Sequence, residues 1–124
     1  MAATIGFYLS GVIAFAIIFI GCRFLLAPST AAAAYGVPAG AEPHLRAYLS
    51  AKGIRDIASG LFTAILIAHG SAHVIGWFML AATLIPIADA VIVLHQGGSR
   101  TVAFGVHGST SVVMLITSGL LLID

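Results

Sequence analysis

Hydrophobic positions along the chain fall into four long runs, separated by short polar or turn-rich segments. The runs cover residues 5–26, 44–68, 73–95 and 101–123. Each is about 22–25 residues long, which is enough for a helix to cross the hydrocarbon core of a bilayer with some tilt. Residues 29–43, between the first two runs, are small and turn-rich and are predicted to form the one long loop. The pattern predicts a single all-α domain over residues 1–124, a compact bundle of four transmembrane helices.

Composition supports a membrane protein. Hydrophobic residues make up 60% of the chain and charged residues 7%, whereas about 25% of the residues of a soluble domain are charged. The lipid bilayer is therefore the expected partner, and a net charge of +1 gives no reason to expect a nucleic acid. The single cysteine, Cys22, excludes an intrachain disulfide and a cysteine metal cluster. The first run lacks a basic leader and is longer than the apolar part of a signal peptide, so we interpret it as an uncleaved span.

Basic residues at the ends of the runs predict the orientation. Arg23 and Arg46 flank the first connection and Arg100 lies in the third, whereas the second connection and both termini have no lysine or arginine. The positive-inside rule then places the first connection in the cytoplasm and both termini on the non-cytoplasmic side.

Ionisable residues also lie well inside three of the runs. They are Lys52, Arg55 and Asp56 in the second run, Asp89 in the third and His107 in the fourth. Because neighbouring helices alternate in direction, a rise of about 1.5 Å per residue puts all five at a similar depth, about 10–18 Å from the cytoplasmic ends. A charge facing lipid near mid-membrane costs about 2.5–3.5 kcal/mol. We therefore expect these side chains to face the interior of the bundle and to be paired there.

Helical spacing predicts which of these side chains share a face. Lys52, Asp56 and Ser59 recur at one face of the second run, so Lys52 is expected to pair with Asp56. Arg55 lies on the flank of that face and is expected to reach Asp89 on the third run. Pro86 cannot donate a hydrogen bond to the carbonyl of the fourth residue before it, which predicts a loosened helix just ahead of Asp89.

Three segments carry a resemblance to a known family. They are Gly21-Cys22-Arg23-Phe24-Leu25-Leu26-Ala27-Pro28, Gly53-Ile54-Arg55-Asp56-Ile57-Ala58-Ser59-Gly60 and Ile85-Pro86-Ile87-Ala88-Asp89-Ala90. Together with His107 in the last run, they resemble the small membrane family catalogued as domain of unknown function 4267. The resemblance implies a compact four-helix bundle, distantly similar to DoxX-like proteins, and it implies no defined activity.

The buried polar layer favours a membrane-embedded enzyme that acts on a small lipophilic substrate by acid–base chemistry, such as isomerisation, cyclisation or epoxide opening. Asp89 is the expected general acid or base, His107 relays protons, and Arg55 holds a developing oxyanion or orients Asp89. The expected substrate-binding or supporting residues are Lys52, Asp56, Ser59, Arg23 and Ser111. No cofactor or metal is expected, and a haem held by a histidine is a minor alternative.

Two other functions fit the same residues. One is a small proton-coupled transporter or binding protein for hydrophobic molecules, since an intramembrane carboxylate serves such a protein. The other is a non-catalytic partner subunit, in which the charges only hold helices together. Small residues in the first two runs, among them Gly6, Gly53 and Gly60, allow close helix contact within one chain or between copies. With four short helices enclosing little volume, a homo-oligomer is also expected.

Overall fold

The computed structural model describes residues 1–38 and 42–123, and every regular element in these ranges is a helix. Its elements are α1 (Ala2–Leu26), α2 (Pro28–Tyr35), α3 (Pro43–His69), α4 (Ala72–Ala82), α5 (Leu84–His95), α6 (Arg100–Val102), the π-helical segment η1 (Ala103–Gly108) and α7 (Ser109–Leu122). The all-helical prediction is confirmed, and each of the four hydrophobic runs is helical. Residues 39–41 of the predicted loop lie outside the described residues.

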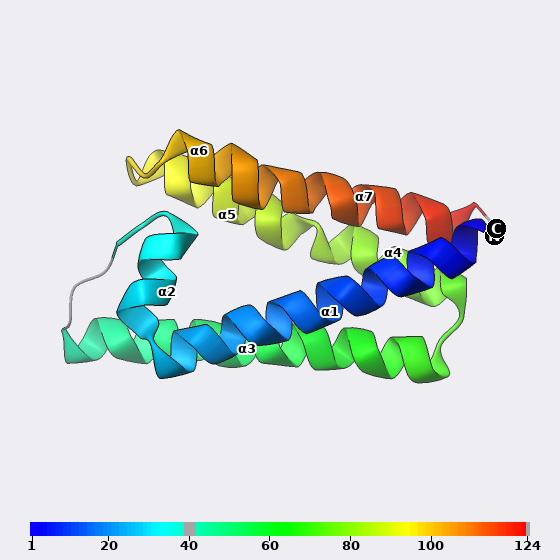
Figure 1. Cartoon of the computed structure of the whole chain (residues 1–124), viewed down its shortest axis with the longest axis horizontal. Helices are drawn as coiled ribbons and strands as arrows, with labels where there is room; N and C mark the ends of the chain where they lie inside the picture. Colours follow the sequence, from blue (N-terminus) through cyan, green and yellow to red (C-terminus); the bar gives the residue numbers. More distant parts are fainter. Residues whose placement is uncertain (39–41, 124) are drawn as a thin grey trace.

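The long helices form two pairs that meet at one end of the molecule and diverge toward the other. α1 packs along α3, and α4 with α5 packs along the rod made of α6, η1 and α7 (Figure 1). At the end where the two pairs meet, α1 contacts α4 and α7, and the apolar core gathers around Ile75, Met79 and Leu121. At the opposite end α2 lies between the pairs (Figure 1). The two helix pairs therefore lie like the sides of a wedge, and α2 lies at its wider end (Figure 1).

Glycines set the close approach of α1 and α3. A Cβ atom added at Gly53 would lie 2.7 Å from the carbonyl oxygen of Gly21, and one added at Gly60 would lie 2.7 Å from the carbonyl oxygen of Ala14. The two backbones therefore touch, as small residues permit in membrane helices. The expectation of close contact at Gly53 and Gly60 is confirmed, and the contact is within the chain.

Among the residues that the structure describes, three helical segments are long and apolar enough to cross a membrane: Ala2–Leu26, Ala72–His95 and Arg100–Leu122. The fourth predicted span, residues 44–68, does not qualify. Although α3 has 27 residues, any stretch of 18 within it includes Lys52, Arg55 and Asp56. The prediction of four apolar spans is therefore wrong for this helix, whose first half is charged and whose second half is apolar.

The predicted loop after α1 contains a helix. Pro28 occupies the first turn of α2, and Gly36 ends it in the left-handed conformation with φ 107°. This order of proline and glycine is typical of helix ends. Gly36 packs against Val93 of α5 and Val102 of α6. α2 also contacts α1 and α3, and it carries Tyr35 to the pocket between the helix pairs.

We expect the α1–α3 contact to be sensitive to one methyl group. Gly53→Ala should lower the free energy of unfolding by about 1–3 kcal/mol, because the added carbon overlaps backbone that cannot move aside. The matched control is Gly11→Ala in α1, where no atom lies within 4 Å of the added carbon. Thermal or denaturant unfolding in detergent measures both. Equal stability of the two variants would contradict the close packing.

Candidate functional site

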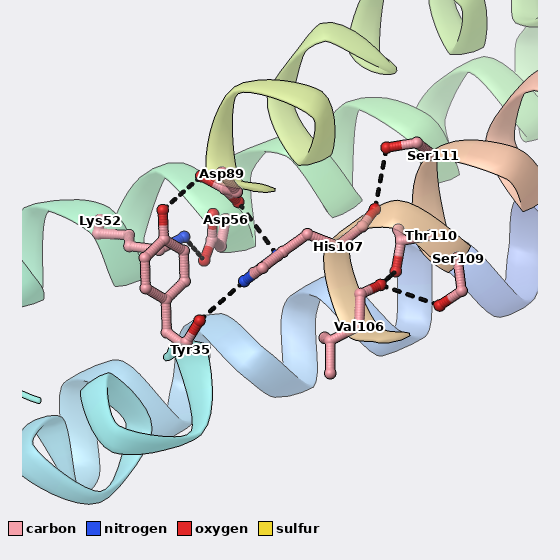
Figure 2. Close-up of polar contacts among 9 residues, drawn as sticks. All are labelled: Tyr35, Lys52, Asp56, Asp89, Val106, His107, Ser109, Thr110 and Ser111. Atoms are coloured by element: carbon pink, nitrogen blue, oxygen red, sulfur yellow. Dashed lines mark hydrogen bonds and ion pairs between the residues drawn. The ribbon is translucent and has the colours of Figure 1, made fainter. Parts of the chain in front are cut away.

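A pocket of about 540 Å³ lies between the two helix pairs. Its lining comes from α1, α3, α4, α5, η1 and α7, with Tyr35 contributed by α2, and most of it is apolar. Ionisable groups gather where α2 closes the wedge (Figure 2). They are Tyr35, Lys52, Asp56, Asp89 and His107, referred to below as the polar cluster. The pocket therefore has an apolar body and one polar end.

Tyr35, the last residue of α2, connects two segments of the helix pair that contains α5 and η1. Its hydroxyl donates a hydrogen bond to Asp89 Oδ1 at 2.9 Å, and its backbone carbonyl accepts one from His107 Nε2 at 2.8 Å (Figure 2). The rings of Tyr35 and His107 also meet edge to face, with centroids 4.8 Å apart. The end of α2 is thereby fastened to α5 and to η1 at once.

These contacts determine where His107 carries its proton. A carbonyl oxygen only accepts hydrogen bonds, so Nε2 must be protonated. Nδ1 then faces Asp89 Oδ2 at 3.9 Å, too far for a direct hydrogen bond but close enough for an ion pair. Neutral His107 therefore presents the lone pair of Nδ1 toward Asp89, while Nε2 stays bonded to the Tyr35 carbonyl.

The phenol of Tyr35 is held in its neutral form. Burial raises the pKa of the Tyr35 hydroxyl, and the nearby carboxylate of Asp89 raises the same pKa further. The group therefore stays protonated at neutral pH. It is available as a hydrogen-bond donor to Asp89 or to an oxygen atom in the pocket.

Lys52 and Asp56 form the second half of the polar cluster. Lys52 Nζ donates to Asp56 Oδ2 at 2.9 Å, one helical turn away, which confirms the predicted pair. The ammonium also lies 5.0 Å from the ring centre of Phe24 and 5.2 Å from that of Tyr35. Aromatic faces attract cations at such distances. Lys52 thus joins α1, α2 and α3 at the polar end.

A π-helical segment presents His107. π-Helical hydrogen bonding leaves some carbonyls without their usual α-helical donors, and such segments often occur at functional sites. Here three consecutive hydroxyls donate to carbonyls of this segment: Ser109 to Gly105 and Val106, Thr110 to Val106 and Ser111 to His107 (Figure 2). Among the described residues, every buried side-chain nitrogen or oxygen has a hydrogen-bond partner.

The predicted interruption before Asp89 is present. α4 ends at Ala82 and α5 begins at Leu84. Thr83 lies between them and bonds back through its hydroxyl to the Met79 carbonyl at 2.8 Å. Pro86 is buried in the first turn of α5, and Asp89 follows three residues later, facing the pocket.

Arg55 does not occupy its predicted place. It is exposed, it does not line the pocket, and it makes no ion pair with any residue that the structure describes. Asp89 has Tyr35 and His107 as its partners instead. The reason is the packing of α3, which turns Gly53 toward α1 and Asp56 toward the pocket. Arg55 then points outward, and its predicted pairing with Asp89 is wrong.

The other predicted site residues divide into two groups. Ser59 lines the pocket beside Asp56, although its hydroxyl bonds to the Arg55 carbonyl. Arg23 is half-buried near the end of α1 and does not line the pocket. Ser111 is buried and supports the carbonyl of His107 rather than facing the pocket. Within residues 1–38 and 42–123, no three or more histidine, cysteine, aspartate or glutamate side chains are arranged to hold a metal ion.

Comparison with protein families gives a match over most of the chain. The family described as Domain of unknown function (DUF4267) matches residues 14–121, a range that includes the whole polar cluster and nearly all of the pocket lining. No curated protein and no solved structure matches the chain. The resemblance to this family noted in the sequence is therefore confirmed.

The raised pKa of Tyr35 predicts how the stability of the protein changes with pH. Because the folded state holds this proton more tightly than the unfolded state, the stability due to Tyr35 is present below the unfolded pKa of about 10 and is lost as the pH rises above it. A phenolate absorbance titration of the wild type minus that of Tyr35→Phe should show a step above pH 10. A difference step centred at or below the pKa of free tyrosine would contradict the buried bond to Asp89.

Proposed function

We propose that this chain, which belongs to the family described as Domain of unknown function (DUF4267), is a membrane-embedded enzyme that converts a small lipophilic substrate by acid–base chemistry. The observation that carries this proposal is the joined set of Tyr35, Asp89 and His107 at the polar end of an apolar pocket. These three side chains supply a neutral donor, a carboxyl group and an imidazole within contact of one another. Those are the groups that general acid–base catalysis uses.

The pocket limits the size and character of the substrate. A volume of about 540 Å³ corresponds to about 18 water molecules at about 30 Å³ each, so a molecule of roughly 15–20 non-hydrogen atoms fits. Its apolar lining suits a hydrocarbon body. Its polar end suits one oxygen function, such as a carbonyl, hydroxyl or epoxide.

Entry from the bilayer fits the residues at the rim. Val12, Phe62 and Leu84 line the pocket and are also exposed on the outside of the helices. In a membrane these side chains contact acyl chains, so a lipophilic molecule passes into the pocket without crossing water. The positive-inside rule, applied to Arg23, Arg46 and Arg100, favours an orientation with the polar end toward the cytoplasmic leaflet. That orientation puts both termini on the other side.

In the proposed mechanism Asp89 exchanges a proton with the substrate. His107 accepts or returns that proton through Nδ1, while its Nε2–H bond to the Tyr35 carbonyl keeps the ring in place. The Tyr35 hydroxyl donates to the substrate oxygen and stabilises negative charge that develops on it. This is the role that the sequence had suggested for Arg55. Isomerisation, cyclisation and epoxide opening all proceed by such proton movements, without an external oxidant or reductant.

The proposal is tested with purified protein in detergent and a panel of lipophilic epoxides, enones and polyenes of matching size. Asp89→Asn should lower kcat/KM by about 10²–10⁴-fold, because the acid–base group is lost while the shape of the side chain is kept. Tyr35→Phe should lower it by about 10²–10³-fold, since one preorganised donor is removed. Arg55→Gln, on the outer face of α3, should leave it unchanged.

Two outcomes would contradict this account. Unchanged turnover by Asp89→Asn removes the assigned chemistry. Tight binding of panel members that are always recovered unchanged would instead indicate a binding or transport protein. In that case proton release on ligand addition, lost in Asp89→Asn, would identify the carboxyl group as part of a transport site.

A further inference from the structure

Lysine and arginine are distributed unequally around the pocket. The chain has five such residues, namely Lys52 and four arginines. The lysine lines the pocket, and none of the arginines does. An arginine would serve a fixed ion pair well, because its guanidinium is always charged and binds carboxylates with two parallel hydrogen bonds. A lysine differs in one chemical respect: it can lose a proton and become a nucleophile.

The surroundings of Lys52 suit a cationic nitrogen that also meets a substrate. About 27% of the side chain remains exposed, and its Nζ atom bonds to Asp56, whose side chain is 9% exposed. The rings of Phe24 and Tyr35 flank the ammonium, and the apolar pocket begins beside it. A positive charge at this nitrogen is therefore balanced by one carboxylate and two aromatic faces.

We propose that Lys52 forms a Schiff base with a lipophilic aldehyde or ketone, which is then the substrate class of the pocket. This inference rests on the proposed function for the identity of the pocket as the substrate site. In the step, the ammonium gives one proton to Asp56, and the free amine forms a bond to the carbonyl carbon. Asp56 then returns its proton, so the carbonyl oxygen takes up both protons that the nitrogen loses and leaves as water.

Charge is conserved in this step, which matters in an apolar site. One ammonium cation and a neutral carbonyl become one iminium cation and a neutral water. The positive charge stays on the same nitrogen, between Asp56 and the rings of Phe24 and Tyr35. No new charge is created in a medium of low dielectric constant, where it would be costly. The contacts that hold the ammonium therefore also hold the iminium.

The iminium would also give Asp89 a suitable proton to remove. An iminium draws electrons from the carbon atoms next to it and makes their C–H bonds more acidic. Asp89 lies at the same end of the pocket, bonded to the tyrosine whose ring faces Lys52. Removal of such a proton by Asp89 and its return at another carbon shifts a double bond. Lys52 and Asp89 would thus act on one substrate in sequence.

Reductive trapping tests the proposal with dodecanal as the probe. The protein in detergent is mixed with dodecanal and cyanoborohydride, beside Nα-acetyl-lysine amide as a reference amine, and the products are mapped by mass spectrometry. Lys52 should be alkylated about tenfold or more faster than the reference, because the pocket concentrates the aldehyde and orients the amine. Dodecanol, which fills the pocket without reacting, should protect it. Lys52→Arg, which keeps a cation beside Asp56, should show no internal adduct.

Alkylation of Lys52 no faster than the reference amine, or unaffected by dodecanol, would overturn the proposal and leave Lys52 as an ion-pair partner only. Binding of dodecanol to Lys52→Arg shows that the variant retains the folded pocket. The trapping experiment is independent of the test of the proposed function. If Lys52 is not trapped but Asp89→Asn still lowers turnover, only the Schiff base is rejected.

Discussion

The polar end of the pocket depends on the two hydrogen bonds of Tyr35. Its hydroxyl holds Asp89 on α5, and its carbonyl holds His107 on η1. At this end of the molecule the two helix pairs diverge, and α2 lies between them (Figure 1). A side-chain bond and a backbone bond from one residue therefore position the carboxyl group and the imidazole relative to each other. Without them, neither group would have a fixed partner across the wedge.

The same bonds explain how ionisable groups are accommodated among apolar side chains. Burying a polar group without a partner is costly, and a fully connected network avoids that cost. Asp89 accepts from a phenol, His107 donates to a carbonyl, and Lys52 and Asp56 satisfy each other. Three carbonyls of the π-helical segment, those of Gly105, Val106 and His107, also accept hydrogen bonds from hydroxyls. The remaining hydrogen-bonding capacity lies at the polar end of the pocket: His107 Nδ1 and Asp89 Oδ2, which face each other, and the exposed part of Lys52.

Much of this arrangement could be predicted from the sequence, for identifiable reasons. The long hydrophobic runs located the four long helical stretches, and the (i, i+4) spacing predicted the Lys52–Asp56 pair. Equal depth along alternating helices predicted that Asp89 and His107 would meet. Arg55 could not be placed this way, because its direction depends on which face of α3 packs on α1. That choice is made by the contact of Gly53 with Gly21, which spacing within a single helix does not reveal.

Tyr35 was missed because its segment resembles a loop. α2 has only eight residues, too few to be stable as an isolated helix, and it forms by docking Ala31 and Ala32 on Phe24 and Gly36 on α5 and α6. One signal was present in the sequence. Pro28 and Gly36 stand at opposite ends of an alanine-rich stretch, the order typical of helix starts and ends. The π-helical segment had no comparable signal beyond three consecutive hydroxyl residues after it.

The protonation of the His107 ring tests the central claim most directly. Nitrogen-15 NMR of histidine-labelled protein in detergent at neutral pH, with the His107 signals assigned by comparison with His107→Gln, reports which ring nitrogen carries hydrogen. The account predicts a proton on Nε2, bonded to the Tyr35 carbonyl, and an Nδ1 signal that shifts in Asp89→Asn. An unprotonated Nε2 would contradict the account, because a carbonyl oxygen has no hydrogen to donate.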